Sequence, residues 1–476
     1  MKRLTGDNVK RLSSYIKRNG LKASAYKVLE RLDRDDTEKT YAQDVFDLLA
    51  DKEQEELEKE AQFTHRYKFS VIVPAYETGE KRITEMARSV LSQTYDNLEL
   101  CIADASVSDE VENAIKALAT DRVVYKRLAE NKGISENTNE ALKMASGEYV
   151  VFLDHDDIMS RNALYEVMLV LEKGLKEEGG FLTNTVKMVY SDEDKCDDDR
   201  TVYFDHHIKP DFDIDLLRTN NYICHLLTVR RELALEVGGL DKDYDGAQDH
   251  DFIFKCVERL KREEIVHIPK VLYHWRSHIS STATNPDSKL YAYESGKRAV
   301  KAHLERLGIN AEVTDTEHLG FYRVKYRVET DDLLKTVIMT IDELKEKTKE
   351  ELSEAEYEYI MVLNDSVKPL NRDFLEEMLG ILKRDEVGCV GGLVINKGKI
   401  ESAGYSISEN GELTPDFSGL NRHFSGYLHR AKIVREVDAV CTDCMMVKKS
   451  AISENARLNP DKLVVYCPYS VFKRVK

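Results

Sequence analysis

The chain has 476 residues, of which 42% are hydrophobic and 33% are charged. That length allows about three domains of ordinary size, and no apolar run approaches the ~18 residues that a membrane-spanning helix requires. The first residues, Met1 to Asp7, carry charges with no apolar segment behind them, so we expect no signal peptide and a cytoplasmic protein. The formal net charge of -17 argues against general nucleic-acid binding, because neutralising phosphates requires a basic surface.

Residues 1–66 are predicted to form a helical extension. Apolar residues recur there at helical spacing, and residues 1–34 hold ten Lys and Arg against three acidic residues. Two interpretations stay open. Either the extension docks on the rest of the protein, or its basic face makes a peripheral contact with anionic lipid at the inner face of the plasma membrane. The thin apolar stripe favours docking.

Residues 67–325 are predicted to form an α/β domain built on a mostly parallel sheet. Short strand-like runs at 70–74, 98–103, 123–125 and 149–153, the first of them β-branched, alternate with helical stretches, which is the pattern of parallel βαβ units. Sheets of this kind bind ligands at the carboxyl ends of their strands. The polar residues that follow these strands are therefore candidate site residues: Tyr76, Glu77, Asp104 and the run from Asp154 to Asp157.

Three carboxylates, those of Asp154, Asp156 and Asp157, follow directly on the last of these strands. Crowded carboxylates repel one another unless a cation lies among them. A hard divalent ion such as Mn²⁺ or Mg²⁺ binds carboxylate oxygens together with the phosphate oxygens of a nucleotide diphosphate. We therefore predict a metal site here in preference to an ordinary solvated turn.

Two further stretches carry candidate chemistry. Asp249 precedes a helical stretch, where a carboxylate serves either as a helix cap or as a general base for a hydroxyl, and spacing alone does not decide between them. Residues 267–278 contain three histidines and Arg276. A histidine suits Mn²⁺ as a supplementary ligand, and an arginine suits a phosphate.

Together these stretches resemble family 2 glycosyltransferases of the GT-A fold, in particular the bacterial enzymes that build surface glycans. The resemblance is carried by SVIVPAYE (70–77), SVLSQTY (89–95), NKGISENTNEAL (131–142), FLDHDD (152–157), YSDEDK (190–195), GAQDHDF (246–252) and residues 267–278. It implies a Rossmann-like, mostly parallel sheet flanked by helices. Two departures from the family pattern are Thr138, where an arginine is usual, and Gln248, where an acidic residue is common.

The resemblance also implies a role for each matching residue. Asp249 is the expected catalytic base, and Asp154 and Asp156 form the expected DXD motif, with Asp156 the stronger metal contact. His274 or His278 is the expected third metal ligand, and His274 is favoured. The residues expected to contact the donor are Pro74, Tyr76, Glu77, Asp104, Asn131, Gly133, Asp154, His155 and Arg276. Those expected near the acceptor are Asp192, Lys209, Asn220, Tyr222 and Gln248.

The activity implied is metal-dependent, inverting transfer of a sugar from a nucleotide-diphosphate donor. A UDP-hexose is the expected donor, with dTDP open as the nucleotide, and galactose, glucose, an N-acetylhexosamine and rhamnose all stay open as the sugar. The expected acceptor is a hydroxyl of a growing glycan, a lipid-linked glycan or a glycoprotein. Homo-oligomerisation stays open, and no nucleic-acid partner is expected. The alternative is a non-catalytic scaffold that binds a sugar nucleotide or a glycan.

Residues 326–476 are predicted to form a smaller, truncated module of the same α/β type. Three segments of the first domain have echoes here: 148–154 in 358–364, 229–231 in 447–449, and 265–269 in 463–468. Residues 330–356 are expected to be mostly a charged helix. Asn364 stands where the first domain has Asp154, and no counterpart of Asp249 is recognisable, so this module is expected to be catalytically silent.

Overall fold

The computed structural model describes residues 6–33, 41–42, 52–178, 180–277, 290–408, 410–453 and 457–475. The chain divides into two compact units. The first unit comprises residues 36–212 and 221–303, and the second comprises 1–35, 213–220 and 304–476. The N-terminal helix is thus grouped with the C-terminal module, whereas residues 41–42 and 52–66 belong to the first unit. Within the described ranges, the helices are too short or too polar to cross a membrane.

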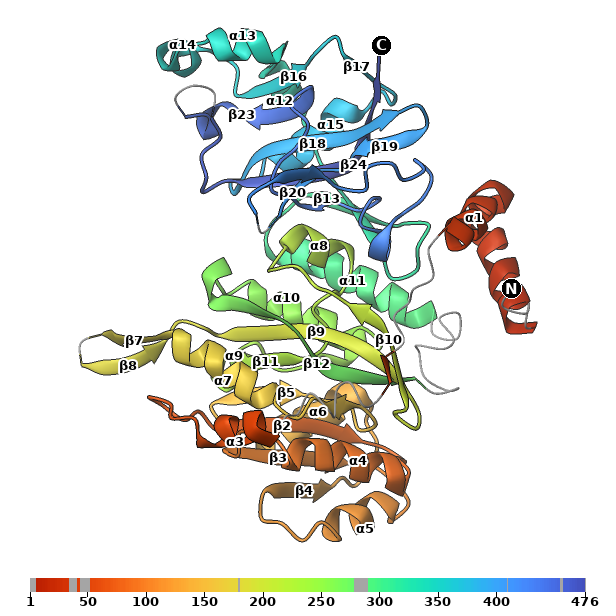
Figure 1. Cartoon of the computed structure of the whole chain (residues 1–476), viewed down its shortest axis with the longest axis vertical. Coiled ribbons are helices and arrows are strands. Elements are labelled where there is room, and N and C mark those ends of the chain that lie inside the picture. Colours follow the sequence, from red (N-terminus) through yellow and green to blue (C-terminus); the bar gives the residue numbers. More distant parts are fainter. Residues whose placement is uncertain are drawn as a thin grey trace. The chain divides into compact units, whose positions relative to one another are not determined.

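The first unit contains the strand and helix alternation expected from the sequence (Figure 1). Its first half consists of β1 (Tyr41–Ala42), α3 (Lys52–Glu60), β2 (Phe69–Ala75), α4 (Glu80–Leu91), β3 (Leu98–Asp104), α5 (Glu110–Lys116), β4 (Val123–Arg127), α6 (Ile134–Met144), β5 (Tyr149–Phe152), β6 (Ile158–Met159) and α7 (Ala163–Lys173). Its second half consists of β7 (Leu175–Glu178), β8 (Phe181–Asn184), β9 (Met188–Asp197), β10 (Val202–His207), β11 (Leu227–Arg230), α9 (Arg231–Glu236), α10 (Gln248–Val257), β12 (Ile265–Ser277) and α11 (Leu290–Arg306), which continues into the second unit.

The sheet of the first unit has a parallel half and a mixed half. Strands β4, β3, β2 and β5 are adjacent and parallel, which confirms the predicted βαβ series. Beyond β5 the direction reverses, because β11 pairs antiparallel with both β5 and β9. Strand β12 then runs parallel to β9 and pairs with the short β6. The carboxyl end of β5 therefore lies beside the start of β11.

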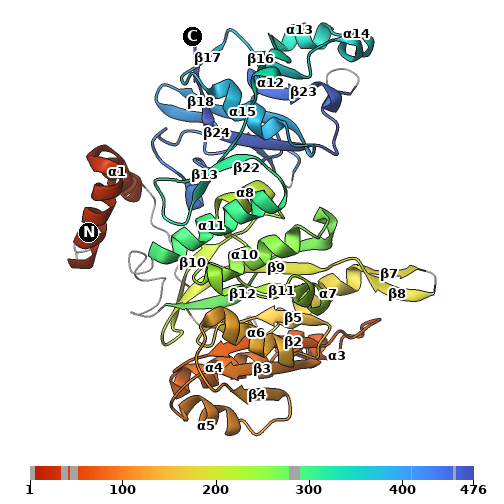
Figure 2. The ribbon, with the colours of Figure 1, turned by 180° about the vertical axis from the view of Figure 1, so that it is seen from behind.

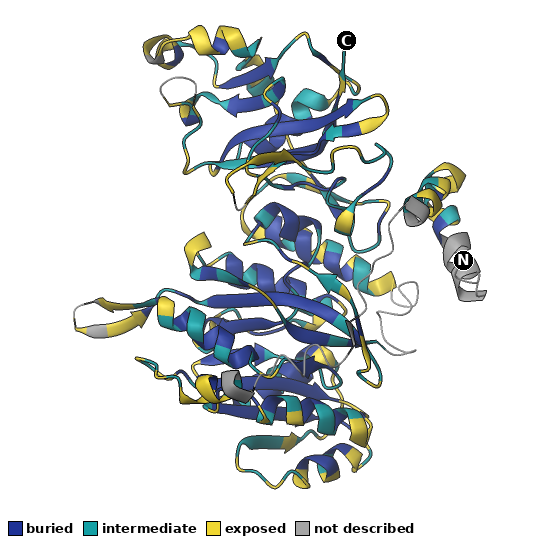
Figure 3. Ribbon diagram, in the orientation of Figure 1, coloured by how far each residue is buried: buried dark blue, intermediate teal, exposed yellow. Residues whose placement is uncertain are grey.

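The central strands are buried on both faces, as Figure 3 shows by their dark colour. All seven residues of β2 and of β3 are buried, as expected for parallel strands covered by helices on either side. Helix α6 packs on β2 and β3, and α7 packs on β12. Seen from behind, α10 lies between β9 and α11 (Figure 2). This layering leaves the loops at the carboxyl ends of the strands to build a site.

The second unit contains a sheet in the order β15-β16-β23-β18-β24-β17. Its elements are α1 (Gly6–Asp33), α8 (Ile214–Thr219), β13 (Ala311–Asp315), β14 (Tyr322–Tyr326), α12 (Thr330–Leu334), β15 (Thr336–Met339), α13 (Ile341–Glu346), α14 (Lys349–Glu354), β16 (Tyr359–Leu363), β17 (Val367–Pro369), α15 (Phe374–Leu382), β18 (Val387–Asn396), β19 (Lys399–Ser402), β20 (Tyr405–Ile407), β21 (Leu413–Pro415), β22 (Arg435–Glu436), β23 (Cys444–Lys448) and β24 (Leu463–Arg474).

The pairing in this second sheet repeats that of the first. Strands β15 and β16 are parallel, β23 runs antiparallel to β16 and β18, β24 runs parallel to β18, and β17 pairs with β24. The three sequence echoes fall on matching strands, β5 with β16, β11 with β23, and β12 with β24. The expectation for 330–356 is corrected by β15, a four-residue strand between short charged helices. A run of four residues is too short for its periodicity to distinguish strand from helix.

Candidate active site

The loop that follows β5 carries an acidic cluster formed by Asp154, Asp156 and Asp157. Burial, followed by the nearby charges of Asp156 and Asp154, raises the pKa of Asp157 well above its usual range. Burial also raises the pKa of Asp154; the nearby His225 imidazole opposes this effect, whereas Asp156 and Asp249 reinforce it. A bound cation relieves repulsion among buried carboxylates. The cluster therefore fits a divalent metal.

His225 is the histidine that the structure brings to this cluster. Leu227 of β11 is opposite Phe152 of β5, so the antiparallel register carries His225 to the level of Asp154. Ligand atoms of Asp154, Asp157 and His225 all lie within 4.8 Å of one another. Carboxylate oxygens and an imidazole nitrogen together suit Mn²⁺. His225 was not among the residues predicted from the sequence, and its position just before an antiparallel neighbour of β5 is the signal that points to it.

His274, the favoured third metal ligand, is turned away from the acidic cluster. Side chains alternate along a strand, and Tyr273 is the β12 residue whose hydroxyl donates to the acidic loop. The Nδ1 atom of His274 lies 2.6 Å from Oδ1 of Asp194, and its Nε2 atom lies 3.0 Å from Oγ of Ser160. The choice of a ligand from spacing thus selected the wrong face of β12. His278 lies outside the described residues.

Asp249 is the second residue of α10, beyond the cap position. Its Oδ2 atom accepts a hydrogen bond from Nδ2 of Asn221 at 2.7 Å. One turn later, Phe252 packs edge-on against Phe152 of β5, with ring centroids 5.1 Å apart. This contact brings the start of α10 to the end of β5, and the charge of Asp249 is close enough to affect the pKa of Asp154. The two carboxylates therefore converge although almost a hundred residues separate them in the chain.

Arg276 is fully buried and supports the acidic loop instead of making the expected contact with a diphosphate. Its backbone N–H donates to Oδ1 of Asp157 at 2.8 Å, and its Nε donates to the carbonyl oxygen of Asp156 at 2.6 Å. Its Nη1 donates to the carbonyl oxygen of Asp198 at 2.6 Å, and its Nη2 lies 2.8 Å from Oε2 of Glu85. The Arg276 side chain thus holds in place the backbone of the loop that carries the Asp156 and Asp157 carboxylates.

Replacing Arg276 with methionine is expected to lower the free energy of unfolding of the first unit by about 3–5 kcal/mol, because the fully buried guanidinium holds the acidic loop and pairs with the partly buried Glu85. The neighbouring Trp275 is the one tryptophan of the chain, so its fluorescence during urea denaturation reports on this unit. Arg259→Met removes a surface ion pair with Glu236 and should change stability by less than about 1 kcal/mol. Equal effects of the two substitutions would contradict the buried supporting role.

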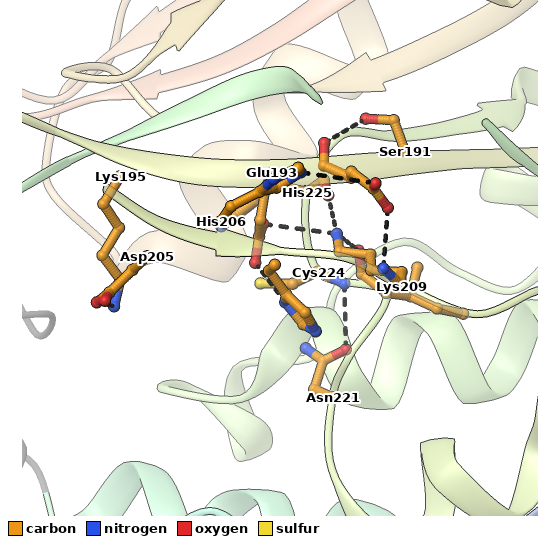
Figure 4. A network of polar contacts seen from close by, with 12 residues as sticks. Ser191, Glu193, Lys195, Asp205, His206, Lys209, Asn221, Cys224 and His225 are labelled. Atoms are coloured by element: carbon orange, nitrogen blue, oxygen red, sulfur yellow. Dashed lines mark hydrogen bonds and ion pairs between the residues drawn. The ribbon is translucent and has the colours of Figure 1, made fainter. Parts of the chain in front are cut away.

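A buried ion pair lies beside the acidic cluster, within the network of Figure 4. The Nζ atom of Lys209 donates to the carbonyl oxygens of Ile223, at 2.7 Å, and of His225, and it lies 3.6 Å from Oε2 of Glu193. Although burial acts to raise it, the Lys209 charge holds the pKa of Glu193 down to about 2. The Lys209 side chain is completely enclosed. It therefore supports the 223–225 loop, whereas the sequence had placed it near the acceptor.

Cys224 links this buried pair to Asp249. Burial, followed by the charge of Asp249, raises the pKa of the Cys224 thiol well above its usual range, and its Sγ atom lies 3.6 Å from Oδ2 of Asp249. Ligand atoms of Glu193, Cys224 and His225 also lie within 4.8 Å of one another. Because the thiol stays protonated and Glu193 is paired with Lys209, this second group suits a cation less well than the acidic cluster does.

Two other residues expected near the acceptor are buried under the site. The Oδ1 atom of Asp192 lies 2.9 Å from Nε2 of His267, and the His267 ring stacks on Tyr190 with centroids 5.0 Å apart. The hydroxyl of Tyr222 lies 3.5 Å from that of Tyr190, and Tyr222 is 1% exposed. These side chains form a packed layer, and as placed they do not present polar groups to a bound ligand.

The remaining two acceptor candidates make different contacts. Asn220 belongs to the second unit, where its Nδ2 donates to the carbonyl oxygen of Gly320 at 2.9 Å. Gln248 opens α10, and its Oε1 accepts the backbone N–H of Gly246 at 2.8 Å. Gln248 therefore holds the loop that leads to Asp249, whereas Asn220 takes part in the internal packing of the other unit.

The expected donor residues after β2 and β5 lie at the carboxyl ends of those strands. Pro74 is a buried member of β2, and Tyr76, just beyond it, is 46% exposed. The Nδ1 atom of His155 lies 2.7 Å from Oγ1 of Thr78, which joins the loop after β5 to the loop after β2. An exposed aromatic ring beside the acidic loop is suited to stack on a base.

Glu77 and Asp104 shape the neighbouring loop after β3. A hydrogen bond from the backbone N–H of Val107, followed by others from Ser108, lowers the pKa of Glu77, whose side chain is exposed. Asp104 is fully buried, and its Oδ2 accepts the hydroxyl of Tyr125 at 2.7 Å. Of the two carboxylates, Glu77 is thus the one placed to meet a ligand, and Asp104 orients the loop around it.

The loop before α6 is joined to the loop that carries Asp249. The Oδ1 atom of Asn131 accepts the backbone N–H of Gly133 at 3.0 Å. Gly133 has a φ of +96°, and a Cβ atom there would lie 2.9 Å from Oδ2 of Asp245. The hydroxyl of Ser135 donates to the same carboxylate. A glycine is required at 133 both for its backbone conformation and for this close approach.

Gly133→Ala is expected to raise the donor KM about tenfold, because the added Cβ meets the Asp245 carboxylate and the left-handed backbone costs about 1–2 kcal/mol. Gly238→Ala is the matched control, since Gly238 has a φ of +87° and a Cβ atom added there would meet no atom of the described residues within 4 Å. Donor KM and melting temperature are measured for both variants. The same KM change in both would contradict a role for the joined loops.

In the second unit, the region that corresponds to the acidic loop contains the positively charged side chain of an arginine. Asn364, which stands where the first unit has Asp154, donates from Nδ2 to Oδ1 of Asp443 at 2.7 Å. The Asp443 carboxylate is also paired with the guanidinium of Arg474, which pairs in turn with Glu401. A fixed arginine thus pairs with the acidic groups here, and the silence of this module stays a prediction.

The first unit therefore offers two chemical functions at one edge of its sheet. The acidic loop can hold a divalent cation, and with it the phosphate groups of a ligand that stacks near Tyr76. Asp249, oriented by Asn221, can accept a proton from a hydroxyl that approaches the same place.

Residues 70–177 match the family model described as "Glycosyl transferase family 2". Over 461 residues the chain is 30% identical to the uncharacterized protein y4gI of Sinorhizobium fredii, covering 83% of this chain and 49% of that protein. It is 31% identical to the O-antigen biosynthesis protein RfbC of Myxococcus xanthus, covering 67% of this chain and 24% of that protein. A shorter match, 34% identical, covers 23% of this chain and 43% of the Escherichia coli protein WfgD, named a UDP-Glc:alpha-D-GlcNAc-diphosphoundecaprenol beta-1,3-glucosyltransferase. The chain thus spans half or less of the length of these relatives.

Proposed function

We propose that this chain, whose residues 70–177 match the glycosyl transferase family 2 model, is a metal-dependent, inverting glycosyltransferase of the GT-A fold. The sugar would pass from a nucleotide-diphosphate donor to a hydroxyl of a surface glycan or glycoprotein. The observation that carries the proposal is the convergence of Asp249 with the acidic loop of Asp154 and Asp156. A family 2 glycosyltransferase needs the base and the metal-binding carboxylates at one site. Carboxylates with purely structural roles in the fold would not need to lie together.

The residues that would hold the metal are Asp154 and Asp156, with His225 as the additional ligand. Their fit rests on the raised pKa of Asp154, which reflects burial and the nearby Asp156 charge, and on the close approach of Asp154 and His225. Oxygen ligands with one imidazole suit Mn²⁺ or Mg²⁺. When bound, such an ion supplies positive charge that stabilises a departing diphosphate.

Asp249 is the proposed general base. Its Oδ2 atom, held by Asn221, would take the proton of the acceptor hydroxyl as the hydroxyl oxygen attacks C1 of the sugar. A single in-line displacement of this kind inverts the anomeric configuration, and its transition state has oxocarbenium character. Burial and the Asp249 charge keep the adjacent Cys224 thiol protonated, so it stays a hydrogen-bond donor to the base and does not compete with it for protons.

The identities of donor and acceptor are inferred from the named relatives. WfgD is named for a UDP-glucose donor and a diphosphoundecaprenol-linked acceptor, and RfbC is named for O-antigen biosynthesis. These names support a UDP-hexose donor and a lipid-linked or growing surface glycan as acceptor. The basic residues of α1 would suit a peripheral contact with an anionic membrane that carries such an acceptor.

The proposal is tested by incubating the full chain with UDP-glucose, UDP-galactose, UDP-N-acetylglucosamine and dTDP-rhamnose, with Mn²⁺ or with EDTA. Released nucleoside diphosphate is then measured. Mn²⁺-dependent release from one donor is expected. A non-catalytic scaffold would bind one of these donors in calorimetry without releasing the nucleotide, and that result would overturn the enzymatic proposal.

A further inference from the structure

The second unit contains a cavity of about 430 Å³ between α1 and two loops of the C-terminal module. Its lining is rich in cationic and imidazole groups, including Lys22, Lys27, Lys432, His318 and His423. Glu30 and Glu317 are the acidic groups of this lining. The cavity belongs to the second unit and shares no residue with the candidate active site.

The walls of this cavity are held together by specific contacts. The Glu30 carboxylate of α1 accepts the backbone N–H groups of Ser425, at 2.7 Å, and of Gly426, at 2.9 Å. The ring of Tyr26 stacks on that of His423, with centroids 4.1 Å apart. Because Glu30 is engaged by these donors, its charge anchors α1 and is less available to offset the lysines of the cavity.

His318 is a buried polar side chain in this lining that lacks a hydrogen bond. It is 9% exposed, and among the described residues neither ring nitrogen has a hydrogen-bond partner, although Nε2 lies 3.4 Å from Oε1 of Glu317. Its ring stacks on His429 with centroids 3.5 Å apart. Burial, followed by the charges of Lys27 and Lys432, lowers the pKa of His318 to about 3. A buried N–H group without an acceptor is unfavourable.

Lys432 supplies a partly buried positive charge beside His318. Its Nζ atom donates to the carbonyl oxygen of Arg422 at 2.6 Å, which leaves further N–H bonds of the ammonium group to be satisfied. Burial lowers the pKa of Lys432; the Glu317 charge opposes this effect and Arg422 reinforces it. A negatively charged ligand would both offset this charge and accept a hydrogen bond from His318.

We propose that this cavity binds the phosphate or diphosphate group of an anionic ligand, held by Lys432, His318 and Lys22. Several clustered oxygens with negative charge match several N–H donors better than a single carboxylate does. The group could be carried by a soluble phosphorylated molecule or by a phospholipid head group at a membrane surface. This inference goes beyond the proposed transferase function and does not depend on it.

The test is a calorimetric titration of the full chain with inorganic pyrophosphate. Lys432→Met and His318→Phe should each weaken binding about tenfold or more, since each removes a donor to a charged group. Lys448→Met is the matched control, because Lys448 is also partly buried in this unit and donates to a backbone carbonyl, that of Arg384, at 2.7 Å. Its affinity for pyrophosphate should equal that of the wild type.

A pH titration of the histidine resonances, monitored by NMR, distinguishes pyrophosphate binding at the cavity from a purely structural effect of the substitutions. Saturating pyrophosphate should raise the pKa of His318, with its resonance identified by its loss in His318→Phe. An unchanged His318 titration, together with equal affinity in wild type and Lys432→Met, would overturn the proposal. If a variant fails to fold, Lys22→Gln on α1 takes its place, and a pyrophosphate affinity equal to that of the wild type would count against the site.

The source of the phosphate is resolved by sedimentation with vesicles. Binding to phosphatidylglycerol vesicles but not to phosphatidylcholine vesicles, lost in Lys432→Met and competed by pyrophosphate, assigns the site to a lipid head group. Pyrophosphate binding without such vesicle binding assigns it to a soluble ligand. Absence of Lys432-dependent binding in both assays contradicts the site altogether.

Discussion

Asp249→Asn is expected to reduce the rate of sugar transfer about 10²–10⁴-fold, because the amide cannot accept the proton of the acceptor hydroxyl. The substitution preserves size, and the amide oxygen can still accept the hydrogen bond from Asn221. Donor and Mn²⁺ affinities should therefore stay within about threefold of the wild type. The rate is measured as nucleotide released per enzyme in saturating donor and acceptor, and the affinities are measured by calorimetry.

Asp243→Asn is the matched control for this variant. Asp243 is an exposed carboxylate in the short helix Lys242–Tyr244, just before the loop that leads to Asp249, and its replacement should leave the rate unchanged. A rate for Asp249→Asn within twofold of the wild type would remove Asp249 from its role as base. A rate loss that comes with weaker donor binding would instead make Asp249 a donor-binding residue.

Asp154→Asn is expected to weaken Mn²⁺ binding at least about 100-fold, which exceeds what loss of an outer-shell contact does. The same change should stabilise the metal-free protein. Burial raises the pKa of Asp154 in the folded state, so the wild type loses stability as the pH rises from the ordinary aspartate pKa through that raised value. The asparagine variant lacks this loss, and its advantage should therefore be larger at pH 8 than at a pH below the ordinary aspartate range.

Melting temperatures followed by Trp275 fluorescence check both effects. In the wild type, Mn²⁺ at 100 times its Kd should add about 2.7 kcal/mol of stability, and Asp154→Asn should lose that gain. Asp199→Asn, which alters an exposed pair with Lys81, should respond to Mn²⁺ as the wild type does. If Asp154→Asn melts below the wild type without metal at pH 8, the acidic loop is not a strained metal site.

The sequence predicted the parallel half of the first sheet because each strand there is a short, mostly apolar run that alternates with a helical stretch. The position of the acidic cluster was predicted as well, because Asp154 directly follows the run that forms β5. His225 was not predicted, because its approach to Asp154 depends on the antiparallel register of β11. Long-range register of this kind leaves no periodic signal near His225 in the chain.

The residues of β12 show that the sequence also does not give the direction of each side chain. Tyr273 and His274 are adjacent, and the spacing in the sequence does not say which of them faces the acidic loop. Arg276 carries a charge that suits a phosphate, but its burial and its contact with Glu85 arise from packing between distant segments. Sequence reasoning thus identified the segments of the site more accurately than the direction of each side chain.

The most direct measurement is a crystal structure of the chain with Mn²⁺ and UDP, using the anomalous scattering of manganese to locate the ion. The account predicts a manganese peak bound by carboxylate oxygens of Asp154 or Asp156, with the Asp249 carboxylate facing the sugar side of the diphosphate. A manganese ion bound away from this loop, or an Asp249 side chain directed away from the bound nucleotide, would contradict it.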